Sequence, residues 1–290
     1  YPGHVVHRRL PALVAGRLSA ADCTVDLGPL VAAAGARWVE ARAVALDLSA
    51  RTVRLSNGQD LPYGVISLDA GGVVDRQAWP GAAEHALFAR PAEHFLHHFD
   101  RLLGLAQRQP LQAVVVGAGA EGFEWALALR HRLAALSPRS TVAWVMEGEH
   151  PLPGWPDAVA ARAREVLRRA GVTALPARCV AVDAQHVHLD NGARAVCDAP
   201  LVVPALAVPA WVRGSGLAVT DTGQVCTTAA MRSTSHPEVF AAGALAHESA
   251  WAAAPWAARQ PVQGRVLAEN LARALRGEPL RESRPPARPA

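Results

Sequence analysis

Three glycines, Gly117, Gly119 and Gly122, have the G-x-G-x-x-G spacing that suits a dinucleotide. The first permits a tight turn out of a strand, the second lets the backbone approach a pyrophosphate, and the third lets a helix pack closely. An apolar stretch at 112–116 precedes the turn and a helical pattern at 123–136 follows it, which is the context that supports this fingerprint. We therefore predict that amides at the helix start bind the phosphates of NAD(H). The alternative is a Rossmann turn that binds nothing.

Carboxylates near this turn could recognise the rest of the cofactor. Glu147 ends the next predicted strand, where a carboxylate accepts hydrogen bonds from the adenosine ribose and repels a 2′-phosphate. No Arg follows it directly, so the sequence favours NAD over NADP; a solvated loop acid is the alternative. Glu124 lies early in the helix, where it either joins the site or only complements the helix dipole. Ala118, between the first two glycines, completes the predicted NAD-binding set.

The elements around the turn predict a doubly wound α/β unit. A strand at 140–146 and a helix at 158–170, ended by Gly171, follow the first strand, turn and helix. Asn57-Gly58 and Asn191-Gly192 predict tight turns between short strands. The other predicted elements are helices at 92–107 and 257–275, and strands at 38–46, 53–55, 65–68, within 180–196, at 201–203 and at 239–242.

The composition excludes several kinds of chemistry. All 29 basic residues among the 290 are Arg, so a Schiff-base lysine and a Walker-A lysine are excluded. The net charge is only +4 and the Arg residues are dispersed, so no nucleic-acid partner is expected. No apolar run reaches the roughly 18 residues of a membrane span, and no signal peptide is seen, which predicts a cytoplasmic protein. The chain does not begin with Met, which leaves open whether it is a fragment.

The Cys and His residues do not form a recognisable redox or metal motif. No C-x-x-C pair occurs, so a redox dithiol and a zinc ribbon are not expected, and the four Cys are interpreted as small buried side chains. His94, His97 and His98 share one predicted helix and are interpreted as solvated. His186 and His188 alternate on one strand and are interpreted as an exposed pair. The sequence therefore singles out no acid–base catalyst and no metal ligand.

Six stretches carry a resemblance that runs, in order, along nearly the whole chain. They are 10–27, 61–72, 80–87, 114–133, 232–246 and 256–280. These stretches resemble the FAD-containing pyridine nucleotide-disulfide oxidoreductase superfamily, in its branch of type II NADH dehydrogenases. Within that branch the sequence is most similar to the oxidoreductase module that some bacteria fuse to selenide, water dikinase.

The resemblance implies two Rossmann-like domains, with the NAD(P)H-binding domain inserted into the FAD-binding domain. The FAD-binding domain then comprises 1–106 and 220–278, the NAD(P)H-binding domain comprises 107–219, and 279–290 is a solvated tail. The implied enzyme passes hydride from NAD(P)H to FAD and on to an unidentified acceptor, a small molecule or a quinone. The resemblance is compatible with a homodimer and with a place in the cytoplasm or at the surface of the inner membrane.

The resemblance assigns a second group of site residues to FAD. They lie in the crossover after a buried strand, just after the last strand, and at the start of the last helix. These residues are Asp69, Gly71, Gly72, Gly243, Arg259 and Gln260.

Departures from the family favour an alternative function. The family opens with its own glycine-rich unit for the ADP half of FAD, and this sequence begins after that unit. Leu245 replaces an Asp that bonds a ribityl hydroxyl, and losing a charge-assisted bond costs about 1.5–3 kcal/mol. Leu206 replaces a glycine and would crowd the cofactor, and the family's C-terminal interface domain is not found after Arg281. The alternative is a degenerate, inactive module that binds a nucleotide or a partner.

Overall fold

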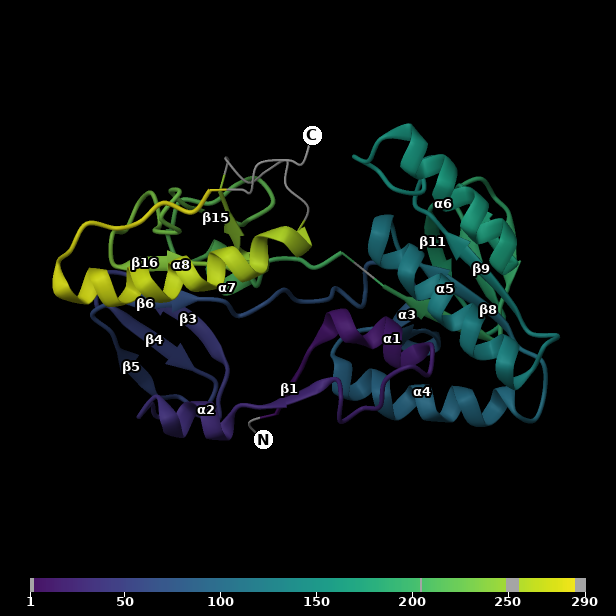
Figure 1. The fold of residues 1–290 in the computed structure, drawn as a ribbon, viewed down its shortest axis with the longest axis horizontal. Helices are drawn as coiled ribbons and strands as arrows, with labels where there is room; N and C mark the ends of the chain where they lie inside the picture. Colours follow the sequence, from purple (N-terminus) through teal and green to yellow (C-terminus); the bar gives the residue numbers. More distant parts are fainter. Residues whose placement is uncertain (1–2, 204, 249–255, 285–290) are drawn as a thin grey trace. The chain divides into compact units, whose positions relative to one another are not determined.

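The computed structural model describes residues 3–203, 205–248 and 256–284, without the side chains of 256–262. The chain divides into two compact units (Figure 1). Unit 1 comprises Tyr1–Trp38 and Val74–Ala205, and unit 2 comprises Val39–Val73 and Leu206–Ala290.

This division differs from the predicted domain bounds in where the N-terminal segment folds. The prediction placed all of 1–106 outside the NAD(P)H-binding segment. In the structure, β7 (Leu87–Phe88) pairs with β14 (Ala199–Val202) at the edge of the unit 1 sheet. Helix α4 (Ala92–Ala106) buries its aromatic side chains in the core beneath that sheet. Contacts between residues far apart in the sequence, which local patterns do not encode, therefore join this segment to unit 1.

Unit 1 is built on a five-stranded parallel sheet, whose strands lie in the order β10 (Val172–Leu175), β9 (Thr141–Val145), β8 (Gln112–Val116), β14 and β7. Its central strand β8 is fully buried from Ala113 to Val116, as a parallel strand covered on both faces should be. Val115 packs into the core on one face, and Val114 and Val116 pack into the core on the other, because successive side chains of a strand alternate.

Helices cover one face of this sheet, and a small antiparallel meander covers the other. Phe95 of α4 and Trp125 of α5 meet edge to face with centroids 4.9 Å apart, inside the core of the helical face. Val182 and Val187 of the meander pack on the opposite face. The helices are α1 (Leu10–Val14), α4, α5 (Gly119–Leu136) and α6 (Asp157–Ala170); the meander strands are β11 (Cys179–Val182), β12 (His186–Leu189) and β13 (Arg194–Val196).

Short elements complete unit 1. Strands β1 and β2 pair antiparallel near its N-terminal end. The prediction that Gly171 ends α6 is confirmed, because it adopts the left-handed conformation with φ of +71°. The remaining elements are β1 (Gly3–Val5), η1 (His7–Arg9), β2 (Thr24–Asp26), α2 (Gly28–Ala33) and α3 (Ala82–His85).

Unit 2 combines an antiparallel meander with two short parallel pairs of strands, β6 (Ile66–Leu68) with β16 (Val239–Ala241) and β15 (Val225–Cys226) with β17 (Ala246–His247). In the first pair, β6 lies beside β16, so both strands end at the same edge. The Asn57-Gly58 turn lies between strands as predicted, with Gly58 at φ of +84°. The other elements are β3 (Ala43–Asp47), β4 (Thr52–Leu55), β5 (Asp60–Pro62), α7 (Ala210–Arg213), η2 (Gly243–Leu245) and α8 (Trp256–Arg276).

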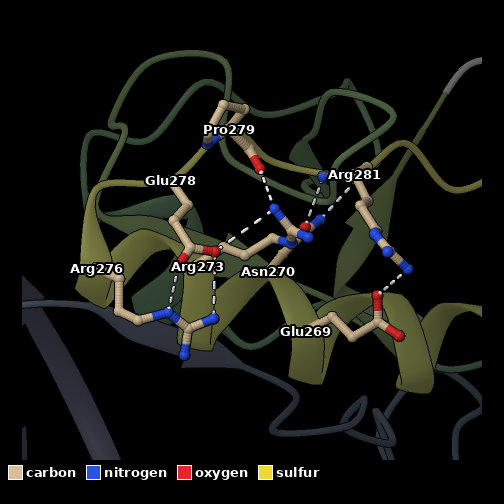
Figure 2. Close-up of polar contacts among 7 residues, drawn as sticks. All are labelled: Glu269, Asn270, Arg273, Arg276, Glu278, Pro279 and Arg281. Carbon is tan, nitrogen blue, oxygen red and sulfur yellow. Dashed lines mark hydrogen bonds and ion pairs between the residues drawn. The ribbon is translucent and has the colours of Figure 1, made fainter.

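The segment after α8 folds back on that helix through one buried side chain (Figure 2). Asn270 is fully buried, and its amide nitrogen donates to the carbonyls of Ala230 and Arg281 at 3.0 and 2.8 Å. Its oxygen accepts the Arg281 N–H at 2.8 Å. The described part of the predicted tail, up to Arg284, is therefore attached to unit 2, whereas its remainder, 285–290, lies outside the described residues.

Candidate dinucleotide-binding site

The glycine-rich turn leaves β8 and starts α5, and its glycines have different surroundings. A Cβ on Gly122 would meet the Gly117 carbonyl oxygen and would lie 2.7 Å from Trp144 Nε1. That indole nitrogen donates to the Gly117 oxygen at 2.7 Å, inside the core. A Cβ on Gly117 would meet the Val203 carbonyl oxygen. Gly117 and Gly122 are thus required by close packing of the turn itself.

Gly119, by contrast, borders open space. Apart from its chain neighbours and the adjoining backbone of α5, no heavy atom lies within 4 Å of a Cβ built there, and its φ is +67°. Ala118 is the N-cap of α5 and makes no side-chain capping bond, so its side chain leaves the first amides of the helix uncovered. These are the groups that bind anions at helix starts.

The position of the turn in the sheet also suits a ligand. From β8 the chain passes to β9 and β10 on one side, whereas β14 and β7 lie on the other side. The strand order therefore reverses beside the carboxyl end of β8. In open α/β sheets, ligands bind at the crevice that such a reversal creates.

Glu147 lies two residues beyond β9, at the same sheet edge as the turn. Its Oε1 accepts the Cys179 N–H at 3.3 Å, and its backbone has φ of +61°. Burial raises the pKa of this carboxyl, and the Cys179 amide partly offsets that shift. A half-buried carboxylate so placed can accept hydrogen bonds from a ribose, and it disfavours a second negative group.

Glu124 lies in the second turn of α5, and its residue is exposed. Burial raises the pKa of its carboxyl, and the nearby charge of Glu121 adds to the shift. The structure also places a residue here that the sequence analysis missed. Arg90 follows β7, and its Nη2 donates to Glu121 Oε1 at 3.3 Å. The signal was an Arg two residues after a short apolar strand, which is informative only once β7 is known to belong to this sheet.

The residues expected to hold FAD lie in unit 2. Asp69 follows β6 and Gly243 follows β16, so the parallel pair brings them together. A Cβ on Gly243 would meet Asp69 Oδ1, and Gly243 has φ of +64°. Gly71, with φ of +66°, has open space at its Cβ position. The structure thus juxtaposes Asp69 and Gly243, whereas the side chains of Arg259 and Gln260 lie outside the described residues.

In unit 2, the protein's own side chains occupy space beside residues that the resemblance assigns to FAD. A Cβ on Gly72 would meet the Leu206 Cβ and would lie 3.1 Å from its Cδ1, so the Leu206 side chain covers this glycine. Leu245 is fully buried in the core of unit 2 and offers no polar group. The carboxylate of Asp69 in turn covers Gly243. Two of the glycines expected to face FAD therefore contact the protein's own side chains.

All four Cys are free, and burial raises the pKa of the Cys179 and Cys197 thiols to about 12, so these two are thiols at neutral pH. Among the described residues, no group of three or more His, Cys, Asp or Glu is arranged to hold a metal ion. Within the same residues, no helix has both the length and the apolar character that a membrane crossing needs.

The sheet order and the glycine-rich turn together define a Rossmann-type dinucleotide-binding protein. The chain belongs to the pyridine nucleotide-disulphide oxidoreductase family, which it matches over residues 28–261. This is a family of oxidoreductase enzymes that use FAD and NAD(P)H. The predicted superfamily and the predicted α/β fold class are thereby confirmed.

Curated relatives cover a smaller part of the chain. An NADH dehydrogenase-like protein of Mycobacterium tuberculosis (strain CDC 1551 / Oshkosh) is 35% identical over 121 residues. The aligned part is 40% of this chain and 30% of that relative, so the chain matches under a third of the relative's length.

Solved structures share the fold along most of the chain. The sulfide:quinone oxidoreductase of Aquifex aeolicus has a TM-score of 0.79 at 17% identity, covering 96% of this chain and 70% of that one. Putidaredoxin reductase, solved in a covalent complex with putidaredoxin, has a TM-score of 0.76 at 19% identity, with 97% and 68% covered. NDH2 from Plasmodium falciparum, solved with NADH, has a TM-score of 0.72 at 13% identity, with 86% and 58% covered.

Proposed function

We propose that the protein binds NADH at the glycine-rich turn of unit 1 and takes part in FAD-dependent hydride transfer from NADH to an electron acceptor. The observation that carries the proposal is Gly119, which borders open space at the start of α5 where the strand order reverses. In this proposal, unit 1 contains the NAD(P)H-binding domain and unit 2 contains the described part of the FAD-binding domain.

Each residue of the site has a definite task in NADH binding. The amides at the start of α5 donate to the diphosphate, and Gly119 leaves the approach clear. Glu147 accepts hydrogen bonds from the adenosine ribose. Its carboxylate is half-buried, so water screens its charge less, and a 2′-phosphate beside it would be repelled strongly. NADH is therefore preferred over NADPH.

Flavin, when bound in members of this family, supplies the hydride acceptor. Leu206 and Asp69 lie where a Cβ on Gly72 and on Gly243 would be. We therefore assign NADH binding to the turn of unit 1 and assign no flavin contact to these two glycines. We also propose that the final electron acceptor is a small molecule or a quinone. In this proposal the protein forms a homodimer and lies in the cytoplasm or at the surface of the inner membrane.

Leu206 and Leu245 favour a second candidate, a module of the same fold that binds a nucleotide or a partner without redox activity. One experiment separates the two. Purified protein is mixed with FAD, and NADH oxidation is followed with a quinone or a dye as acceptor, against free FAD alone. Oxidation above that background, with flavin retained after desalting, supports the enzyme. A protein that binds NADH but retains no flavin supports the second candidate.

Glu147→Gln tests the preferred dinucleotide. We expect it to bind NADPH severalfold more tightly than the wild type does, because the repulsion of the 2′-phosphate is removed, while the affinity for NADH falls slightly. Isothermal titration with both dinucleotides measures the ratio. An unchanged ratio of the two affinities would contradict the role given to this carboxylate.

A further inference from the structure

The start of α5 carries a charge arrangement that works against an anionic ligand. Glu121 is the third residue of α5, and Glu124 follows one turn later. A carboxylate here is stabilised by the helix dipole, and for the same reason it competes with a phosphate for that positive end. Burial and the nearby charge of Glu121 raise the pKa of Glu124, so the negative charge of Glu121 acts on the neighbouring turn of α5.

Arg90 is the cation that meets Glu121. Its Nη2 lies 3.3 Å from Glu121 Oε1, and within the described residues no other ion pair to Glu121 is found. The Arg90 side chain is 19% exposed and that of Glu121 is 48% exposed, so the pair joins a largely buried cation to a half-exposed carboxylate. Partial burial reduces screening by water and salt.

The fold brings Arg90 to this place. It directly follows β7 and Ala89, and β7 runs parallel to β14, which in turn runs parallel to β8. The carboxyl ends of these strands meet at one sheet edge, where the glycine-rich turn also begins. The positive charge of Arg90 also affects the nearby His7. Burial is the larger cause and the Arg90 charge the second cause of a pKa of about 4 for His7. His7 is therefore neutral at pH 7 and adds no positive charge of its own.

We propose that Arg90 is a positioning residue for the dinucleotide, which it serves by neutralising Glu121 beside the phosphate-binding turn. This inference rests on the proposed function. Without Arg90, the carboxylate of Glu121 would face the incoming diphosphate unpaired. With it, the amides of the α5 start keep their attraction for the ligand, and Arg90 itself need not touch the phosphates.

The proposal predicts opposite effects from its two residues. Arg90→Gln leaves the Glu121 charge unpaired and should weaken NADH binding about threefold to tenfold. Glu121→Gln leaves the Arg90 charge unopposed and should strengthen binding by up to about threefold. The double variant restores local neutrality, so its affinity for NADH should lie within about twofold of that of the wild type. Arg90→Lys keeps the charge and should recover most of the affinity.

The test is isothermal titration of the full chain with NADH and with adenosine, at low and high salt. Adenosine carries no phosphate, so its affinity should change less than about twofold in every variant, whereas damage to the fold would weaken both ligands. The loss in Arg90→Gln should shrink at high salt, because the effect is electrostatic. Thermal unfolding of each variant confirms that it is folded at the temperature of titration.

Three results would overturn the inference. An Arg90→Gln variant that binds NADH like the wild type shows that neutralisation is unnecessary. A double variant as weak as Arg90→Gln shows that Arg90 acts directly and not through Glu121. Equal losses for NADH and adenosine show a structural role. Failure of the wild type to bind NADH at all would instead defeat the proposed function, and the inference with it.

Discussion

Replacing Gly119 with alanine places one methyl group in the space that the proposed site leaves for a diphosphate. A Cβ built there has no heavy atom within 4 Å beyond its chain neighbours and the adjoining backbone of α5, so the methyl group displaces nothing in the protein. The backbone has φ of +67°, a left-handed geometry that costs a residue with a Cβ roughly 1–2 kcal/mol. We therefore expect Gly119→Ala to lower the free energy of unfolding by about 1–2 kcal/mol and to leave the packing of the turn intact.

The effect on NADH binding should exceed the effect on stability. The methyl group would project toward the ligand beside the first amides of α5, and a diphosphate held off those amides loses charge-assisted hydrogen bonds of about 1.5–3 kcal/mol each. Loss of one such bond corresponds to a rise of roughly tenfold to a hundredfold in the Kd for NADH.

Titration calorimetry with NADH and chemical denaturation measure the two quantities on the same preparation. Gly104→Ala is the matched control. Gly104 lies inside α4, a Cβ there also has open space, and replacing a helical glycine with alanine should add roughly 0.5–1 kcal/mol of stability. Its Kd for NADH should not change. If folded Gly119→Ala binds NADH as tightly as the wild type does, this turn does not hold the diphosphate.

Three further predictions concern packing, pH dependence and the C-terminal attachment. Gly122→Ala should lower the free energy of unfolding by about 2–5 kcal/mol, because its Cβ displaces the Trp144 indole from a buried hydrogen bond; a loss under 1 kcal/mol in urea titrations would contradict this. Burial lowers the pKa of His7 from 6.5 to about 4, so the unfolded chain binds a proton that the folded chain does not, and stability should fall as pH falls from about 6.5 to 4. In His7→Gln, urea titrations across this range should show a smaller fall, and an equal fall would refute the assignment. Asn270→Ala should lower the free energy of unfolding by about 2–4 kcal/mol in urea titrations, whereas Arg276→Gln, which breaks an exposed ion pair with Glu278, should leave it nearly unchanged; equal effects of the two variants would contradict the role given to Asn270.

Much of unit 1 could be predicted because its signals are local. The strand at 112–116 was predicted at the residues where β8 is found, and the helix at 158–170 differs from α6 by one residue. The predicted helix at 123–136 starts four residues late, because the glycines of its first turn have low helix propensity. The edge strand β7 was missed, because two residues carry no readable periodicity.

The candidate site was predictable only in part, for a related reason. The glycine spacing assigned a role to each glycine of the turn, and the structure adds their surroundings: Gly119 borders open space, whereas Gly122 packs on Trp144. Leu206 was predicted to crowd a cofactor, and in the structure it covers Gly72. No local pattern pairs Arg90 with Glu121, because 31 residues separate them.

The sequence by itself determined the requirements of each segment: glycines where a turn is tight, an apolar strand where both faces are covered, and the family to which the chain belongs. These follow from backbone sterics and from burial of side chains within a few residues. Only the tertiary structure decided which segments meet. It joined residues 74–106 to the nucleotide-binding sheet and attached the segment after α8 through Asn270. Such contacts depend on strand order and on packing between distant parts of the chain, which no short stretch of sequence specifies.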